Sequence, residues 1–283
     1  MITDRRLFLS GGAAAVALAA TGSLFARTAG AQAVGIGLQL YTVREIFQKD
    51  PVGTLQKIAE IGYREVEFGG GGYLDMDHAM LRKTMDRLGL TAPSVHVGYD
   101  DMIDRPDAMI TMAKTLGAEA VVMAFMSEKH RNVAAWSEAV ANFNRFGEKL
   151  RKAGLIFAYH NHDFEFTVAP GGISLFNRLI KDRDPAVLRF ELDLYWLVKA
   201  GQDPKAIIRR LGGQIYAYHA KDLKPDGSMA AVGTGTIDFA SIFKLDPVSG
   251  VRHIFVENDQ APAPYIPDIT TSFRNLRKLR ENV

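Results

Sequence analysis

The chain has 283 residues, carries 34 Lys and Arg against 32 Asp and Glu for a formal net charge of +2, and contains no cysteine. The lack of cysteine excludes disulfides, thiolate metal sites, cysteine nucleophiles and iron–sulfur clusters. Any metal must therefore be bound by His, Asp and Glu side chains. The near-neutral charge gives no indication of a nucleic-acid-binding or membrane-binding surface.

The first 31 residues are typical of an export signal. Arg5 and Arg6 form a twin arginine, an Ala- and Gly-rich apolar run follows at 11–20, and small-x-small cleavage sites lie at 29–31 and 31–33. The alternative is an uncleaved membrane anchor, but this run is short and poorly suited to spanning a bilayer. We expect twin-arginine export, a periplasmic mature domain at 32–283 with a net charge near zero, and no stable membrane anchor after cleavage.

The mature part alternates between expected strands and helices. Strands are expected at 35–40, 64–68, 92–97, 120–125, 155–158, 187–193, 214–219 and 252–257, and helices at 52–61, 77–88, 106–116, 132–153, 173–181, 204–211, 239–245 and 266–280. Eight strand–helix units in about 250 residues predict a single-domain α/β protein, a (β/α)₈ TIM barrel. An open doubly wound sheet is the alternative, but no dinucleotide glycine fingerprint follows the first strand. The glycine run 69–72 lacks the lysine and serine of a phosphate loop and is interpreted as a flexible active-site loop.

Polar side chains that can bind a metal follow or end most of the expected strands. They are Glu67, His96, His160, Asp193, His219 and Glu257. The densest run is YHNHDFEF at 159–166, for which an ordinary polar loop is the alternative interpretation. In a barrel the carboxyl ends of the strands meet at one mouth, where active sites of this fold lie. The sequence therefore predicts one site built from these residues.

Carboxylates combined with imidazoles, without sulfur, suit a divalent ion such as Mn²⁺, Mg²⁺, Co²⁺ or Zn²⁺. Three or four protein ligands would leave room for two substrate oxygens. A metal held in this way acts as a Lewis acid on a carbonyl and its neighbouring hydroxyl. A flanking carboxylate or imidazole can then move the proton between them.

Four motifs carry a resemblance to a known family: YHNHDFEF at 159–166, LDLYW at 192–196, YHAKD at 218–222 and FVE at 255–257. Together they resemble the sugar phosphate isomerase/epimerase family, xylose-isomerase-like TIM barrels that include inosose dehydratases and keto-sugar 3-epimerases. The resemblance runs from residue 37 to the last helix. It implies a single divalent metal, manganese before magnesium, cobalt or zinc, held by Glu, Asp, His and Glu from strands five to eight.

The family pattern assigns three of its four ligand positions directly. Asp193, His219 and Glu257 match the last three, and Glu257 is also expected to take part in acid–base catalysis. The first ligand position departs from the family pattern, because this chain has His160 where the family has glutamate. Either His160 is the ligand or Glu165 reaches back from the loop; Glu165 is favoured, which leaves His160 as a catalytic base.

Further residues are expected to line the cavity and bind substrate, namely Glu67, His96, His162 and Lys221. For Lys221 the alternative is a surface ion pair with Asp222. Glu191 lies two residues from Asp193 on the same strand face, and a structural ion pair and a role in the site stay equally open. Tyr195 and Trp196 form either an apolar wall for a sugar ring or part of the core.

These observations predict a divalent-metal-dependent sugar isomerase or epimerase that abstracts a proton next to a sugar carbonyl. The alternative is a β-eliminating lyase or dehydratase acting on 3-keto-glycosides or inosose-like substrates. An abasic-site endonuclease is less favoured, since it needs a three-metal cluster and a basic groove. A non-catalytic periplasmic sugar-binding protein is also less favoured, since no second lobe is evident. The expected partner is a small sugar or keto-sugar and not a nucleic acid, and oligomerisation is left open.

Overall fold

The computed structural model of the protein describes residues 34–167 and 172–281. The expected export signal at 1–31 lies outside these residues, so its cleavage and its route stay predictions. Among the residues that the structure describes, no helix is long and apolar enough to cross a membrane.

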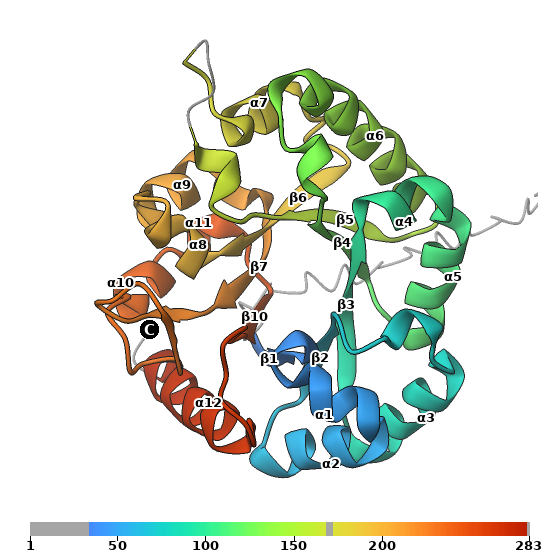
Figure 1. Cartoon of the computed structure of the whole chain (residues 1–283), viewed down its shortest axis with the longest axis vertical. Helices are drawn as coiled ribbons and strands as arrows, with labels where there is room; N and C mark the ends of the chain where they lie inside the picture. Colours follow the sequence, from blue (N-terminus) through green and yellow to red (C-terminus); the bar gives the residue numbers. More distant parts are fainter. Residues whose placement is uncertain (1–33, 168–171, 282–283) are drawn as a thin grey trace, which may run out of the picture. The chain divides into compact units, whose positions relative to one another are not determined.

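Eight parallel strands form a closed barrel in the order β1-β10-β7-β6-β5-β4-β3-β2 (Figure 1). The strands are β1 (Gly35–Gln39), β2 (Glu65–Phe68), β3 (Thr91–Gly98), β4 (Ala120–Phe125), β5 (Ile156–His160), β6 (Leu188–Asp193), β7 (Ile215–Ala220) and β10 (His253–Val256). The predicted (β/α)₈ barrel is confirmed. The short antiparallel pair β8 (Asp222–Leu223) and β9 (Met229–Ala230) follows β7 and was not expected from the sequence.

Helices surround the ring of strands (Figure 1). The α-helices are α1 (Arg44–Lys49), α2 (Pro51–Ile61), α3 (His78–Leu88), α4 (Tyr99–Asp104), α5 (Pro106–Leu116), α6 (Val133–Lys152), α7 (Leu175–Asp182), α8 (Leu194–Lys199), α9 (Pro204–Leu211), α10 (Phe239–Phe243), α11 (Asp246–Ser249) and α12 (Ile266–Arg280). Single-turn 3₁₀ segments are η1 (Leu40–Val43), η2 (Tyr73–Asp75), η3 (Glu128–His130), η4 (Phe164–Phe166) and η5 (Gly212–Gln214). The expected long helices are present, whereas the short helices α1, α4, α8 and α11 were not predicted.

Local sequence signals explain where several helices begin. The Asp77 side chain accepts a hydrogen bond of 2.9 Å from the Met80 amide at the start of α3, so the expected N-cap is confirmed. Asp203 caps α9 in the same manner, with Pro204 at the first helical position. Such caps fix the point at which each connection leaves the strand end and turns back along the barrel.

The lower part of the barrel interior is apolar. A small cluster fills it, formed by Ala120, Val122, Ala158, Tyr216, Ala217 and Phe255. Along β5 and β7 the next inward positions after Ala158 and Ala217 are His160 and His219, because side chains alternate with a period of two. The polar residues therefore form a layer directly above an apolar plug, at the carboxyl end of the barrel.

Candidate active site

Strand register brings the polar strand ends to one level. His160 of β5 pairs with Glu191 of β6, and Asp193 of β6 pairs with His219 of β7. On the other side of the barrel, Glu67 of β2 is the partner of both Gln39 and Ser94, and both donate hydrogen bonds to its carboxylate. The closed barrel thus joins these residues into one buried network.

Asp193, His219 and Glu257 form a compact group. Each offers a ligand atom, these atoms lie within 4.8 Å of one another, and all three residues are buried. His219 Nδ1 lies 2.6 Å from Glu257 Oε2. Asp193 Oδ2 is buried and makes no hydrogen bond of good geometry, although Lys221 Nζ lies 3.1 Å from it and His160 Nε2 3.7 Å. Three of the residues predicted as metal ligands therefore lie together, with His160 beside them.

Glu191 is the centre of a second group, which also contains His96, His160 and His219. Its Oε1 atom lies 2.7 Å from His96 Nε2, 3.0 Å from His160 Nδ1 and 3.0 Å from His219 Nε2. Its Oε2 atom is buried without a hydrogen bond. Glu67 Oε2 also contacts His219 Nε2, at 2.7 Å, and His96 Nε2, at 2.9 Å. Of the two roles left open for Glu191, this placement favours one in the site.

The imidazoles of this network differ in protonation. Burial opposes protonation of His96, but Glu67 and Glu191 outweigh it and raise its pKa to about 9. Burial likewise opposes protonation of His219, but Glu191, Glu257 and Glu67 raise its pKa well above the usual value. Burial first, and then the neighbouring His219, lower the pKa of His160. His160 is thus a neutral imidazole whose Nε2 faces Asp193.

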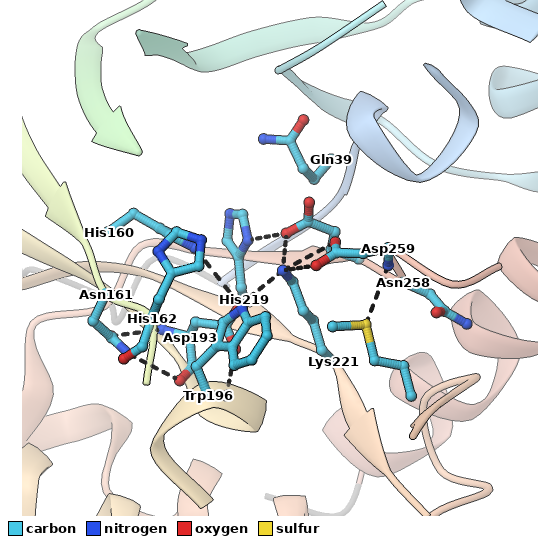
Figure 2. A network of polar contacts seen from close by, with 12 residues as sticks. Gln39, His160, Asn161, His162, Asp193, Trp196, His219, Lys221, Asn258 and Asp259 are labelled. Atoms are coloured by element: carbon cyan, nitrogen blue, oxygen red, sulfur yellow. Dashed lines mark hydrogen bonds and ion pairs between the residues drawn. The ribbon is translucent and has the colours of Figure 1, made fainter. Parts of the chain in front are cut away.

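Lys221 is buried among carboxylates (Figure 2). Its Nζ atom lies 2.9 Å from Glu257 Oε2, 3.1 Å from Asp193 Oδ2 and 3.1 Å from Asp259 Oδ1. Burial opposes its charge, but Asp193, Glu257 and Asp259 raise the pKa of Lys221 well above its usual value. The alternative of a surface pair with Asp222 is wrong: Asp222 instead accepts hydrogen bonds from four backbone amides, at 223, 233, 235 and 237.

Glu165 belongs to neither group. Tyr159 Oη donates a hydrogen bond of 2.7 Å to its Oε1 atom, and the His162 amide donates one of 2.9 Å to its Oε2 atom. Burial raises the pKa of Glu165 to about 8. Both oxygens are thus engaged within the β5–α7 connection. The structure does not bring Glu165 to Asp193, His219 and Glu257, and His160 is the candidate that it places beside them.

A cavity of about 480 Å³ opens above the network. Of the expected substrate-binding residues, His96, His162 and Lys221 line it, together with His160 and Glu257. Glu67 lies below this surface, fully buried. Tyr195 is part of the core, whereas Trp196 is half-buried, with its ring centroid 5.9 Å from Lys221 Nζ and 5.6 Å from the His162 ring. The glycine run contributes Gly69 and Gly70 to the cavity wall.

Sequence reasoning missed several residues of the site. Asp259 was not predicted, although its position two residues after Glu257 could have indicated a role in the site. Tyr41, Phe125 and Arg131 also line the cavity. Their positions depend on loops and on a strand irregularity, for which the sequence carries no metal-like or catalytic pattern.

The residues present fit a divalent metal. Asp193, His219 and Glu257 provide two carboxylates and an imidazole, a donor set that suits Zn²⁺ and Mn²⁺. The buried Asp193 Oδ2 atom has Lys221 Nζ at 3.1 Å but no hydrogen bond, so it keeps the capacity to bind a metal. His219 Nε2 is held by Glu191 and Glu67, which leaves Nδ1 on the side of Glu257. Such outer partners are typical of metal-binding histidines.

A closed parallel barrel with carboxylates and imidazoles at the carboxyl ends of its strands defines the class of TIM-barrel proteins whose site lies at that mouth. The sequence model described as "Xylose isomerase-like TIM barrel" matches residues 55–245, and the chain belongs to this family.

Individual proteins and structures that resemble this chain share about a quarter or less of its sequence. An inosose dehydratase of Lacticaseibacillus casei is 26% identical over 162 residues, which cover 50% of this chain and 53% of the relative. The chain thus spans about half the length of the curated relatives it matches. A sugar phosphate isomerase/epimerase structure from Parabacteroides distasonis has a TM-score of 0.74 at 24% identity, covering 88% of this chain and 96% of that one. The structure of the IOLI protein with a bound zinc atom has a TM-score of 0.67 at 16% identity, covering 87% and 98%. These two structures show the fold alone.

Proposed function

We propose that the protein is a divalent-metal-dependent sugar isomerase or epimerase that abstracts a proton next to a sugar carbonyl. The observation that carries the proposal is the convergence of Asp193, His219 and Glu257 within 4.8 Å, with a neutral His160 beside them at the floor of a cavity. Membership of the family and the similarity to a sugar phosphate isomerase/epimerase structure support this class.

Asp193, His219 and Glu257 would hold the metal. When bound, the ion supplies Lewis-acid polarisation of a carbonyl and an adjacent hydroxyl oxygen of the substrate. A zinc atom is bound in the similar IOLI structure, which supports a metal in a protein of this fold, and manganese, magnesium and cobalt stay alternatives.

His160 is suited to move the proton. Its Nδ1 atom lies 3.0 Å from Glu191, which orients the ring, and its neutral Nε2 is free to accept a proton on the cavity side. Glu257 directly follows β10 and His160 ends β5, so the two approach a bound sugar from different sides of the mouth. Return of the proton on the opposite face gives an epimer, and transfer to the neighbouring carbon gives an isomer.

A second activity shares this first step. If a leaving group lies β to the carbonyl, the same enolate expels it and the enzyme is a lyase or dehydratase. The observation that favours this alternative is the similarity to inosose dehydratases. Lys221, held by Asp259 beside Glu257, is placed to protonate a departing oxygen.

The test is solvent exchange of substrate C–H protons in D₂O, with a panel of free, keto- and 3-keto-sugars and Mn²⁺ present. We expect exchange with at least one sugar, and an about hundredfold slower rate in His160→Ala, the usual size of an acid–base contribution. Metal retention in His160→Ala distinguishes a base from a ligand: loss of the metal makes His160 the fourth ligand. No exchange with any sugar by the metal-loaded protein contradicts the proposal.

Export is a separate proposal, and residues 1–33 lie outside the described part of the chain. It is supported by Arg5-Arg6 and the apolar run that follows. Replacement of both arginines by lysine is expected to leave the protein in the cytoplasm. Unchanged export of that variant contradicts the twin-arginine route.

A further inference from the structure

The cavity extends well beyond the candidate metal ligands. Asp193, His219 and Glu257 come from β6, from β7 and from the residue after β10, whereas most of the cavity wall comes from the ends of β1 to β4. These two sets of strands form opposite halves of the barrel mouth (Figure 1). His160 of β5 lies next to β4, where the two halves meet, and His96 of β3 reaches across to Glu191 of β6 at 2.7 Å. Both histidines line the same cavity, which therefore extends from the candidate metal ligands to a second region.

The whole cavity is larger than one sugar ring requires. A hexose has about twelve non-hydrogen atoms, each of which needs less room than a water molecule with its share of about 30 Å³. The cavity volume of about 480 Å³ exceeds that need. It falls in the range of roughly 300–1,000 Å³ that encloses ligands larger than a monosaccharide.

Two exposed aromatic rings flank this region. Phe125 is 63% exposed and Tyr41 is 39% exposed, and both line the cavity. Phe125 ends β4, which is otherwise largely buried, at a register shift: Val97 pairs with Met123, but Gly98 pairs with Phe125. The register shift leaves one extra residue in β4, and such an irregularity turns the side chain that follows it away from its regular direction. Two exposed aromatic rings on the wall of one cavity offer apolar faces against which a ligand ring can pack.

The surroundings fix both rings. The Arg44 guanidinium lies 4.3 Å from the centroid of the Tyr41 ring, and it donates a hydrogen bond of 2.8 Å to the Tyr41 carbonyl. Gly70 packs closely against the Tyr41 ring: a Cβ atom at position 70 would lie 2.5 Å from the nearest ring atom. Arg131 lies 5.9 Å from the Phe125 centroid, and its Nε atom is held by the Met126 carbonyl at 2.7 Å. The Tyr41 ring is thus held by Arg44 and Gly70, and the Phe125 ring has the Arg131 cation beside it.

We propose that Tyr41 and Phe125 form a subsite for a second ring, so that the substrate is a keto-glycoside, which carries its carbonyl on the sugar ring and has a sugar or aryl aglycone, and not a free monosaccharide. This inference rests on the proposed sugar chemistry and names its substrate class. The reacting sugar occupies the half of the mouth next to Asp193 and His219. The aglycone lies over β1 to β4, with an apolar ring face against an aromatic side chain.

The test compares binding of phenyl α- and β-D-glucopyranoside with binding of D-glucose by calorimetry. Wild type is expected to bind at least one phenyl glycoside about tenfold or more tightly than glucose. Phe125→Ala and Tyr41→Ala are each expected to weaken that glycoside about three- to tenfold and to leave glucose nearly unchanged, in line with the strength of aromatic ring contacts. Val248→Ala on α11 is the matched control, since it removes another exposed apolar side chain, outside the cavity.

Equal binding of glucose and both glycosides by wild type, or equal weakening of all three in Phe125→Ala, overturns the proposal. So does sedimentation analysis in which wild type is dimeric and Phe125→Ala is monomeric, since a second copy then covers the ring. The readout is separate from catalysis. If the variants selectively lose glycoside binding but the protein exchanges C–H protons of no sugar, the subsite is supported and the proposed function is rejected. If the protein exchanges such protons but the variants show no selective loss, the proposed function is supported and the subsite is rejected.

Discussion

Tyr159 donates a hydrogen bond of 2.7 Å to Glu165, and both residues are fully buried. This bond and the His162 amide occupy the carboxylate that the sequence favoured as the fourth metal ligand. We therefore expect Glu165→Gln to keep one divalent metal per chain, measured by elemental analysis of the purified variant. Glu257→Gln is the matched control, which is expected to lose metal. Loss of metal from Glu165→Gln would return Glu165 to the ligand set.

The same carboxyl predicts a pH dependence. Burial raises the pKa of Glu165 to about 8, above the value of about 4.3 for an exposed glutamate. Folding therefore takes up a proton, so the stabilisation is present below about pH 4.3 and is lost as the pH rises through 8. The loss is at most about 1.4 kcal/mol per pH unit. In Glu165→Gln, denaturant unfolding at pH 5 to 8 is expected to show a smaller decline, and a decline equal to wild type contradicts this assignment.

Lys221 competes with a metal for two carboxylates. Its Nζ atom lies 2.9 Å from Glu257 and 3.1 Å from Asp193. Removing a positive charge so close to both is expected to tighten Mn²⁺ or Zn²⁺ binding by about tenfold in Lys221→Met, measured by calorimetric titration. Lys199→Met is the control, because Lys199 contacts Tyr195 and Trp196 and neither carboxylate. Weaker metal binding in Lys221→Met would show that the lysine supports the site.

Glu191 orients the imidazole rings of the site. Its Oε1 atom lies 3.0 Å from both His219 Nε2 and His160 Nδ1. Loss of such an outer partner usually weakens metal binding by about 10- to 100-fold. We expect that range for Glu191→Gln, with an altered visible spectrum of the Co²⁺-loaded protein. Glu60→Gln, on the exposed face of α2, is expected to change neither, and unaltered affinity and spectrum in Glu191→Gln would make this carboxylate merely structural.

His253 stabilises the opposite end of the barrel. Its ring lies between Glu65 at 2.8 Å and Glu119 at 3.3 Å. Burial opposes protonation, but Glu119 and Glu65 outweigh it and raise the pKa of His253 to about 9. The stabilisation is full below about pH 6.5, the usual value for histidine, and is lost as the pH rises through 9. His253→Gln is expected to lower the free energy of unfolding by about 1–2 kcal/mol at pH 6. The effect is no larger because Glu119 is half-exposed and its charge is screened by solvent. At pH 10 the free energies of unfolding of the variant and of wild type are expected to differ little. A difference that is constant with pH contradicts this assignment.

The sequence was most informative where chemistry followed strand periodicity. Asp193, His219 and Glu257 each come at the end of a buried strand, and parallel strands deliver such residues to one edge. The barrel, its eight strands and the convergence of these three residues could therefore be predicted. The alternation of side chains also placed Glu191 on the face of Asp193, but only barrel closure brings it to His96, which lies three strands away in the sheet.

The rest depends on features without periodicity. Glu165 lies in a connection, where spacing from the strand does not fix the direction of the side chain, and a local hydrogen bond to Tyr159 decided its place. In the sequence Phe125 is one more apolar residue of an apolar strand. The register shift that exposes its side chain cannot be predicted from the residue types. Asp259 acquires its role through Lys221, a contact between two strand ends that the sequence does not reveal.

Metal content of Asp193→Ala tests the account most directly. Asp193 has a buried Oδ2 atom without a hydrogen bond and lies within 4.8 Å of the ligand atoms of His219 and Glu257. Wild type purified with Mn²⁺ or Zn²⁺ is expected to retain one ion per chain after removal of free metal. Asp193→Ala is expected to retain none, while its circular dichroism stays that of a folded barrel. A folded Asp193→Ala variant with a full complement of metal would contradict the assigned site.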